Sequence, residues 1–299
     1  MSDVSWLADK KNKLRRAASR AAHKARGERP VVVSLTSYPS RINTVWQSVR
    51  TLFGQTRLPD KTVLYLAKSD FPNREADLPE LLTSMLWHDF EIRWVDQDLK
   101  SHKKYHWAFK EFEDCLVVTV DDDLLYRKTM IEELVTGYKD HPGCVVASRG
   151  HLINFNEDGS VAPYDAWISE VGLKYPVMLN VPSMRLFATT GAGTLFDPKL
   201  LPDITFDAEL ACELCLHADD IWLKFCETVA GIPTVFITSQ QGCDCVPETQ
   251  AVGLWATLNS QGGNDRAIRA LLGNEAMCKA LPGPFEVLVR DDDLDARLK

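Results

Sequence analysis

Three consecutive carboxylates are the group in this sequence that most clearly suggests chemistry. Asp121, Asp122 and Asp123 follow the apolar run CLVVTV (115–120) without a gap. Alternate residues of an extended chain point the same way, so Asp121 and Asp123 can face one side. Like charges this close repel each other unless a cation or a cationic ligand offsets them. A hard divalent cation that is bridged to substrate phosphates fits such an all-oxygen set.

A solvated turn after a strand is the plainer interpretation of the same residues. A second acidic triplet, residues 291–293, follows the apolar run FEVLV. It lies near the C-terminus, outside the alternating core pattern, and we interpret it as part of a surface tail. In an open α/β sheet, ligands bind at the carboxyl ends of the strands. The position of residues 121–123 at the end of a core strand therefore favours a functional role for the first triplet.

An acidic pair, Asp219 and Asp220, opens a segment with helical spacing at 219–230. Aspartate is favoured at a helix start because it caps the free amides and complements the helix dipole. Capping explains one aspartate well and the second less well. A carboxylate in this place can also remove the proton of an attacking hydroxyl, as a general base does.

The elements that must position these residues alternate along the first half of the chain. Stretches with helical spacing, such as 45–53, 78–86 and 131–138, separate short β-branched runs. This alternation predicts an α/β fold with a mostly parallel, Rossmann-type sheet covered by helices on both faces. The β-branched runs are VVVSLT (31–36), TVLYLA (62–67), FEIRWV (90–95), CLVVTV (115–120), CVVAS (144–148) and PTVFIT (233–238).

The later chain is less regular. Proline and glycine interrupt residues 150–215 repeatedly, so we expect a loop-rich region that leads into a strand near GAGTLF. The helix at 219–230 and a last core strand follow. The expected division is a basic N-terminal helix at 1–29, a main domain at 30–265 and a C-terminal tail at 266–299.

Charge is distributed unevenly over the 299 residues. The net charge is −8, yet residues 10–29 hold nine Lys or Arg against one Glu. The acidic remainder argues against nucleic-acid binding, which favours a basic surface. No run of about 18 apolar residues is present, and the N-terminus lacks the apolar segment of a signal peptide, so we expect a cytoplasmic protein.

The sequence resembles a bacterial glycosyltransferase family of the GT-A fold, similar to family 2 and of the polysaccharide-biosynthesis type. The resemblance covers about residues 30–265. It implies that Asp121 and Asp123 bind Mn²⁺ or Mg²⁺, that Asp122 lies near the donor sugar or ribose, and that Asp220 is the general base, with Asp219 orienting the acceptor. The motifs that carry it are VSLTSYPSRI (33–42), LPDKTVLYLAKSDFP (58–72), DLKSHKKY (98–105), VTVDDDLLY (118–126), SRGHLI (148–153) and HADDIWLKF (217–225).

Two further groups of residues are candidates for the walls of a substrate site. Hydroxyl, aromatic and cationic side chains end the first strand, where a nucleotide would sit, and lysines further on can offset diphosphate charge. Glycines permit close approach of the backbone to a ligand. Solvated surface and turn roles remain open for each. The donor candidates are Thr36, Ser37, Tyr38, Arg41, Asp98, Lys103 and Lys104, and the acceptor candidates are Arg149, His151, Gly191 and Gly193.

A third protein ligand for the metal is not evident. GT-A enzymes often supply a late histidine, but no histidine follows His217. Asp244 and Asp265 are candidates, and the diphosphate with water is the alternative. Cys212, Cys215, Cys243 and Cys245 could form a zinc site, although the second spacing is tighter than usual and unligated thiols are favoured.

The predicted function is therefore a metal-dependent, inverting hexosyltransferase. Its donor would be a nucleotide-diphosphate sugar, UDP-linked for preference, and its acceptor a glycan or lipid-linked glycan of cell-surface polysaccharide. The basic segment at 10–29 could hold it at the anionic inner membrane face, dock on an acidic body or bind a partner. The rival functions are a nucleotidyltransferase acting on a sugar phosphate and a non-catalytic glycan- or membrane-binding protein on the same fold.

Overall fold

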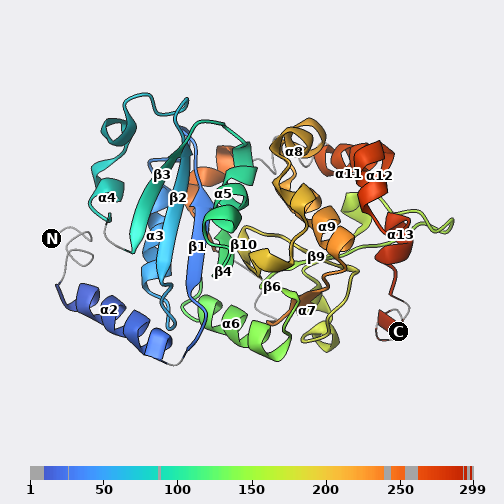
Figure 1. Ribbon diagram of the computed structural model, residues 1–299, viewed down its shortest axis with the longest axis horizontal. Coiled ribbons are helices and arrows are strands. Elements are labelled where there is room, and N and C mark those ends of the chain that lie inside the picture. The colour runs from blue at the N-terminus through green and yellow to red at the C-terminus, as the bar shows by residue number, and fades with distance from the viewer. Residues whose placement is uncertain are drawn as a thin grey trace.

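The computed structural model describes residues 10–25, 27–86, 89–238, 244–252, 262–291, 293–294 and 297. A seven-stranded sheet forms the centre, with strand order β11-β6-β10-β4-β1-β2-β3 (Figure 1). All neighbours are parallel except β10, which pairs antiparallel with both β4 and β6. The strands are β1 (Val31–Thr36), β2 (Lys61–Ala67), β3 (Phe90–Val95), β4 (Leu116–Val120), β6 (Val145–Ala147), β10 (Ala192–Phe196) and β11 (Thr234–Phe236).

The predicted α/β fold with a mostly parallel sheet is confirmed. Each of the six β-branched runs contains a strand of this sheet, and the strand expected near GAGTLF is β10. The helices are α2 (Lys10–Ala25), α3 (Val45–Phe53), α4 (Glu80–Thr83), α5 (Lys103–Glu111), α6 (Met130–Asp140), α7 (Val171–Lys174), α8 (Ala208–Cys215), α9 (Asp219–Ala230), α11 (Gly263–Gly273), α12 (Glu275–Ala280) and α13 (Phe285–Leu288).

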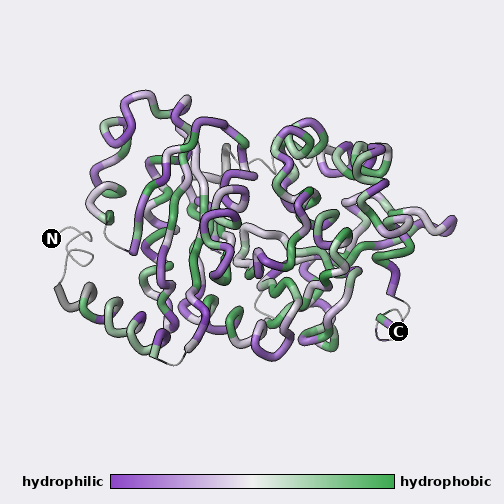
Figure 2. The backbone as a smooth tube through the Cα atoms, viewed as in Figure 1, coloured by the Kyte–Doolittle hydropathy of each residue, from purple (hydrophilic) through white to green (hydrophobic). Residues whose placement is uncertain are grey.

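The alternation of side chains along β1 explains why the sheet is covered on both faces. Val31, Val33 and Leu35 are buried in a core that includes residues of α3 and α6. Val32 points the other way, into a second core that includes residues of α5 and α9. A strand buried on both faces has apolar residues throughout, as parallel strands do. Figure 2 shows this as hydrophobic colouring along the central strands.

Short elements fill the second half. A three-stranded antiparallel sheet has the order β8-β7-β9, and β12 pairs antiparallel with β5, the strand just after the acidic triplet. The strands are β5 (Leu124–Leu125), β7 (Gly150–Leu152), β8 (Ile168–Ser169), β9 (Leu186–Ala188) and β12 (Asp244–Cys245). The 3₁₀ helices are η1 (Arg74–Asp77), η2 (Lys100–His102), η3 (Tyr164–Ala166), η4 (Pro176–Met178), η5 (Pro198–Leu200), η6 (Asp203–Phe206) and η7 (Pro247–Val252).

The sequence predicts a C-terminal tail at 266–299, and the structure has three helices, α11 to α13, over most of this part of the chain. Helix α11 runs across that boundary, and the helices α11, α12 and α13 bury apolar side chains in the same core as α9. The rings of Phe225 and Phe285 stack with centroids 4.0 Å apart. Asp291 accepts a hydrogen bond of 2.5 Å from Ser183, so the start of the second acidic triplet is also tied to the body. An amphipathic helix needs a partner for its apolar face, and α9 supplies one.

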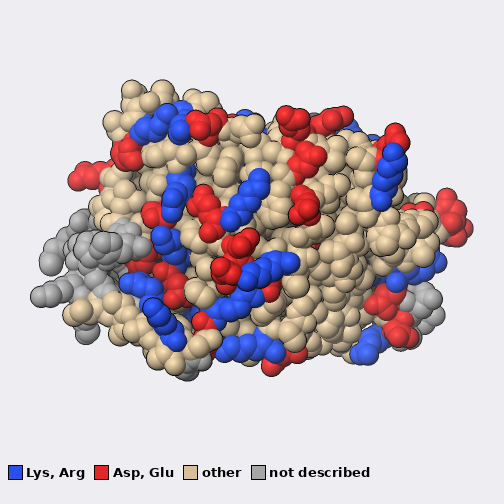
Figure 3. All heavy atoms as spheres, viewed as in Figure 1, with Lys and Arg blue, Asp and Glu red and all other residues tan. Residues whose placement is uncertain are grey.

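The N-terminal basic segment forms helix α2, which lies against the body on the side of α3 (Figure 1). Arg20 pairs with the buried Asp89 at 2.9 Å, and Arg15 donates to the carbonyl of Gln55. Leu14 is exposed. None of the described helices is long and apolar enough to cross a membrane. Figure 3 shows acidic and basic side chains interspersed over the face in view, so this face has no large field of one sign.

Candidate active site

A cavity of about 870 Å³ lies at the carboxyl ends of β1 and β4, where the loops after these strands meet the start of α9. This is the edge at which an open α/β sheet binds its ligands. Most of the predicted site residues line the cavity, and only Gly193 does not. The predicted residues in its walls are Thr36, Ser37, Tyr38, Arg41, Asp98, Lys103, Lys104, Asp121, Asp122, Asp123, Arg149, His151, Gly191, Asp219 and Asp220.

Asp122 is the buried member of the acidic triplet. Its two oxygens accept from Ser37 at 2.5 Å and from Arg41 at 2.9 Å. Burial raises the pKa of Asp122, while Arg41 and Ser37 lower it. Because both of its oxygens have partners, Asp122 joins the end of β4 to the loop after β1 and offers the cavity little.

Arg41 is a clamp on the triplet. Its guanidinium also reaches Asp123 at 2.9 Å and lies over the ring of Tyr38, 5.6 Å from the centroid. The side chain is nearly buried, and its Nε has no hydrogen-bond partner among the described residues. Burial, and next the charge of Asp121, raise the pKa of Asp123 to about 6. The triplet thus retains excess negative charge despite the clamp.

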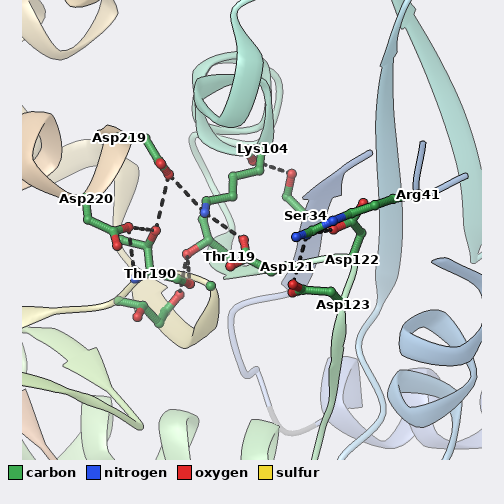
Figure 4. A network of polar contacts seen from close by, with 12 residues as sticks. Ser34, Arg41, Lys104, Thr119, Asp121, Asp122, Asp123, Thr190, Asp219 and Asp220 are labelled. Carbon is green, nitrogen blue, oxygen red and sulfur yellow. Dashed lines mark hydrogen bonds and ion pairs between the residues drawn. The ribbon is translucent and has the colours of Figure 1, made fainter. Parts of the chain in front are cut away.

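Lys104 connects two acidic groups that are far apart in the sequence. Its Nζ lies 2.9 Å from Asp121 and 2.9 Å from Asp219, and its side chain is 3% exposed (Figure 4). Burial lowers the pKa of Lys104, but Asp121, Asp219 and Asp220 together raise it well above the ordinary value. Lys104 therefore stays charged, and it holds the end of β4 against the start of α9.

Asp219 and Asp220 have opposite environments. Burial alone would raise the pKa of Asp219, yet the Lys104 ammonium and His102 hold it down at about 2. Burial and the charge of Asp219 raise the pKa of Asp220 to about 7. Thr190 orients Asp220: its amide donates to Oδ1 at 3.1 Å, and its hydroxyl donates to the same oxygen. When the surroundings push the pKa values of two carboxylates apart, the difference typically indicates which acid–base role each of them has.

The carboxylate of Asp121 lies so close to residue 191 that only a glycine fits there. A Cβ at this position would lie 1.7 Å from Oδ2 of Asp121, so a side chain here would displace that carboxylate. The hydroxyl of Tyr126 donates to the carbonyl of Gly191 at 2.7 Å and contacts the backbone of Asp121, which fixes the turn. Gly193 is different. It is buried in β10 at φ +97°, facing Met130, so its prediction as an acceptor contact is wrong.

Residues from the second half of the chain form the far wall of the cavity. Arg149 donates from Nε to Thr189 at 3.1 Å, and His151 packs edge-on against Tyr164, with ring centroids 5.4 Å apart. Burial and Arg149 lower the pKa of His151 to about 4, so it is neutral near pH 7. Burial, followed by the charge of Asp220, raises the pKa of Tyr164. The Tyr164 ring therefore lies in the field of Asp220.

Three further donor candidates in the cavity wall, Thr36, Asp98 and Lys103, bind one another or a neighbouring strand. Asp98 pairs with Lys103 and with Lys100. Burial would raise the pKa of Asp98, but its pairing with both lysines lowers it. The hydroxyl of Thr36 donates to the carbonyl of Tyr65 at 2.8 Å. Lys103 and Lys104 are thus both committed to carboxylates.

The donor set fits a hard cation held by two carboxylates. Asp121 is 40% exposed and Asp123 is 17% exposed. Burial is the main cause of the raised pKa of Asp123, and the charge of Asp121 adds to it. Magnesium often uses one or two protein carboxylates and completes its shell with phosphate and water. Within the described part of the chain, no group of three or more His, Cys, Asp or Glu side chains could hold a metal ion.

The proposed additional ligands lie elsewhere. Asp265, on α11, accepts from the amide of Tyr164 at 2.8 Å. Asp244 is exposed on β12, and neither aspartate lines the cavity. Cys212 and Cys215 lie on α8, Cys245 lines the cavity, and Cys243 lies outside the described residues.

Sequence reasoning missed four positioning residues. They are Thr190, Tyr126, Tyr164 and Ser34. The first three are residue types that do not by themselves suggest chemistry, and the hydroxyl of Ser34 donates to the backbone carbonyl of Lys104. Thr190 directly precedes the glycine-rich turn, and Tyr126 closes the DDDLLY motif. Proximity to these motifs was the only signal in the sequence, since each of the four acts on residues that the fold brings near.

Comparison with known proteins finds similarity among solved structures alone. No protein-family model matches the chain, and no curated protein matches it. Among solved structures, it is similar to residues 1–349 of TarS from S. aureus in complex with UDP, with 12% sequence identity and a TM-score of 0.43. The match covers 72% of this chain and 59% of that chain, so it spans less than two thirds of TarS 1–349. We draw no conclusion about activity from a likeness at this level.

Proposed function

We propose that this protein is a glycosyltransferase that uses a nucleotide-diphosphate sugar. The observation that carries the proposal is the pair Asp219–Asp220 facing Asp121 across Lys104 in one cavity at the carboxyl edge of the sheet. A sugar transfer needs a place for an anionic donor and a carboxylate base near the acceptor. This cavity offers candidates for both within a single space.

The donor half is assigned to the loop after β1 and the acidic triplet. Tyr38 and Ser37 supply an aromatic face and a hydroxyl for the nucleoside, which we take to be uridine. Arg41 lines the cavity beside the triplet, so its guanidinium can offset the charge of a phosphate group placed there. Asp122 fixes this loop and does not itself bind the donor strongly.

A divalent cation, Mn²⁺ or Mg²⁺, fits beside Asp121 and Asp123. When bound, it would offset the charge of the diphosphate and of these two carboxylates. The protein residues keep separate tasks: Arg41 and Lys104 hold the carboxylates in place, and Gly191 leaves room for Asp121.

The acceptor half is assigned to Asp220 and the far wall. Asp220 takes the proton of the acceptor hydroxyl while that oxygen bonds to the anomeric carbon of the donor sugar. The bond from that carbon to the diphosphate breaks, and the nucleoside diphosphate leaves. Attack from the side opposite the leaving group inverts the anomeric centre. Thr190 orients the base, and Arg149, His151 and Tyr164 line the space for the acceptor.

The proposed acceptor is a glycan or lipid-linked glycan of cell-surface polysaccharide. The basic segment at 10–29 supports contact with an anionic membrane surface, because Lys and Arg each add about 1 kcal/mol near such a surface. Helix α2 lies on the outside of the body, and the side chain of Lys24 on it is exposed.

The test is a calorimetric titration with UDP and Mn²⁺, followed by a donor screen. Wild-type protein should bind UDP with Mn²⁺, and Asp121→Ala and Asp123→Ala should lose the metal-dependent part. Lys279→Ala, at an exposed ion pair on α12, is the matched control and should bind normally. Hydrolysis of an NDP-sugar then supports a glycosyltransferase. Release of pyrophosphate from a nucleoside triphosphate and a sugar phosphate would instead establish a nucleotidyltransferase, and ligand binding without turnover would establish a binding protein.

A further inference from the structure

Lys104 is placed where the donor and acceptor halves of the cavity meet. It is the second residue of α5, and its Nζ lies 2.9 Å from Asp121 at the end of β4 and 2.9 Å from Asp219 at the start of α9. The three residues come from three elements on two sides of the cavity (Figure 4). No other contact among the described residues joins the acidic triplet to the acidic pair by an ion pair.

One positive charge is shared between these two carboxylates. The side chain of Lys104 is 3% exposed and that of Asp219 is 9% exposed, so water screens their interaction poorly. A single ammonium cannot fully neutralise two carboxylates. Whatever strengthens its interaction with Asp121 must therefore weaken its interaction with Asp219, and the reverse.

The adjacent lysine shows that this sharing is specific to Lys104. Lys103 is equally buried on the same helix, yet its ion pair is with Asp98 alone, and Asp98 also has Lys100. Lys103 thus binds the single carboxylate of Asp98, whereas Lys104 binds one carboxylate from each half.

We propose that Lys104 couples donor binding to the acceptor half by dividing its charge between Asp121 and Asp219. The inference rests on the proposed function and assigns Lys104 as a positioning residue, not as a direct ligand of the diphosphate. A cation and diphosphate that engage Asp121 shift Lys104 toward Asp219, which sets the charge beside Asp220. By thermodynamic linkage, the state of Asp219 must in turn alter the affinity of the donor site.

Binding of UDP with Mn²⁺, measured by calorimetry, tests this coupling without any turnover. In Asp219→Asn, Lys104 is left with Asp121 alone and neutralises it more completely. Affinity for Mn²⁺ with UDP should therefore fall about three- to tenfold. Asp207→Asn is the matched control, since Asp207 caps α8 outside the cavity and asparagine can keep that cap; its affinity should stay within about twofold of wild type. Equal affinity in wild type and Asp219→Asn would overturn the coupling.

A double-mutant cycle identifies Lys104 as the mediator. In a Lys104→Met background, Asp219→Asn should cause no further loss of affinity, whereas in a Lys103→Met background it should cause the full loss. An equal loss in both backgrounds would show that Lys104 does not carry the effect. Thermal melting of each variant precedes the titrations. If Lys104→Met does not fold, the comparison of Asp219→Asn with Asp207→Asn decides by itself, because both retain the Lys104–Asp121 pair.

The failure of the coupling and the failure of the proposed function give different results. Wild-type protein that binds Mn²⁺ but not UDP would refute the assignment of a nucleotide donor. The coupling would then be read from Mn²⁺ alone, which should still bind more weakly to Asp219→Asn. Normal UDP binding in every variant would instead retain the donor site and remove the role of Lys104.

Discussion

Asp219 and Asp220 are adjacent residues of one type, and their surroundings give them different properties. Asp219 faces Lys104 at 2.9 Å and is held ionised, whereas Asp220 accepts a hydrogen bond of 3.1 Å from the amide of Thr190. The helix-capping interpretation does not account for either, because neither side chain caps α9: Ala218 is the residue before the helix, and it has no side-chain cap. The raised pKa of Asp220 near 7 is the property expected of a general base.

The pH dependence of transfer follows from that raised pKa. Below about pH 7, Asp220 is protonated and cannot accept the acceptor proton, so kcat should fall as the pH is lowered. In Asp220→Asn this rising limb should vanish, and kcat should drop by about 10²–10⁴ while the affinity for UDP changes little. Initial rates from pH 5 to 9 in wild type and variant measure both effects.

Two results would contradict the assignment of Asp220. Near-normal turnover in Asp220→Asn would remove it from the role and favour Asp219. An unchanged rising limb in that variant would show that another group titrates, and Asp123, whose pKa is also raised, is the first candidate.

At the scale of single residues, the acidic residues of the site could be predicted from the sequence, but the side chains that they pair with could not. Asp121 and Asp220 follow from their types and their places after a strand and at a helix start. Lys104 was expected to meet a diphosphate, and instead it binds two carboxylates, 17 residues ahead in one case and more than a hundred in the other. Such pairings depend on the packing of α5 against β4 and α9, which the local pattern of residues does not contain.

Among the elements, the strands were the most predictable. Each predicted strand is an apolar run that the sheet buries on both faces, so its composition alone specifies it. The apolar spacing predicted a helix over 78–86, but α4 is shorter. It begins after Pro79, and its regular part ends at Thr83. Leu78 and Met85 are buried all the same.

The C-terminal helices were the least predictable elements. They are short, and their partner α9 ends at Ala230, well before α11 begins at Gly263 and α13 begins at Phe285. The contact of α13 with α9 depends on one aromatic pair, Phe225 and Phe285, whose rings are nearly parallel, with 2° between their planes. A pair of this kind is not visible in the periodicity of either helix.

Phe285→Ala should therefore destabilise the whole domain and not only the end of the chain. The ring is buried, and deleting it leaves a cavity against Phe225, so the free energy of unfolding should fall by about 3 kcal/mol. Val287→Ala, in the same helix but 64% exposed, should cost little. Urea denaturation of both variants measures the difference. Equal stability in the two would mean that α13 is a dispensable appendage.

The whole molecule combines an acidic body with a basic N-terminal helix that rests on it. Arg20 pairs with Asp89, and Glu28 pairs with both Arg57 and Lys139, so ion pairs join this segment to the body. These contacts support docking on the protein's own body for part of the helix. Lys24 on the same helix is exposed, and the segment 10–29 as a whole has a net charge of +8.

The remaining basic charge predicts binding to anionic vesicles. The body carries −14 and is repelled overall, but a local cluster adheres when it approaches the surface within a Debye length. The apolar residues of α2 are mostly alanine, so adhesion should be electrostatic, with little insertion. Co-sedimentation with vesicles that contain anionic lipid should therefore be strong at low salt and weaken as salt rises. Deletion of residues 1–25 should abolish it while keeping Glu28 and Arg29, which bind the body through Arg57 and Asp197. Neutral vesicles are the control for both proteins. Equal sedimentation of the full-length and truncated chains would discard the membrane contact and leave docking on the body as the role of α2.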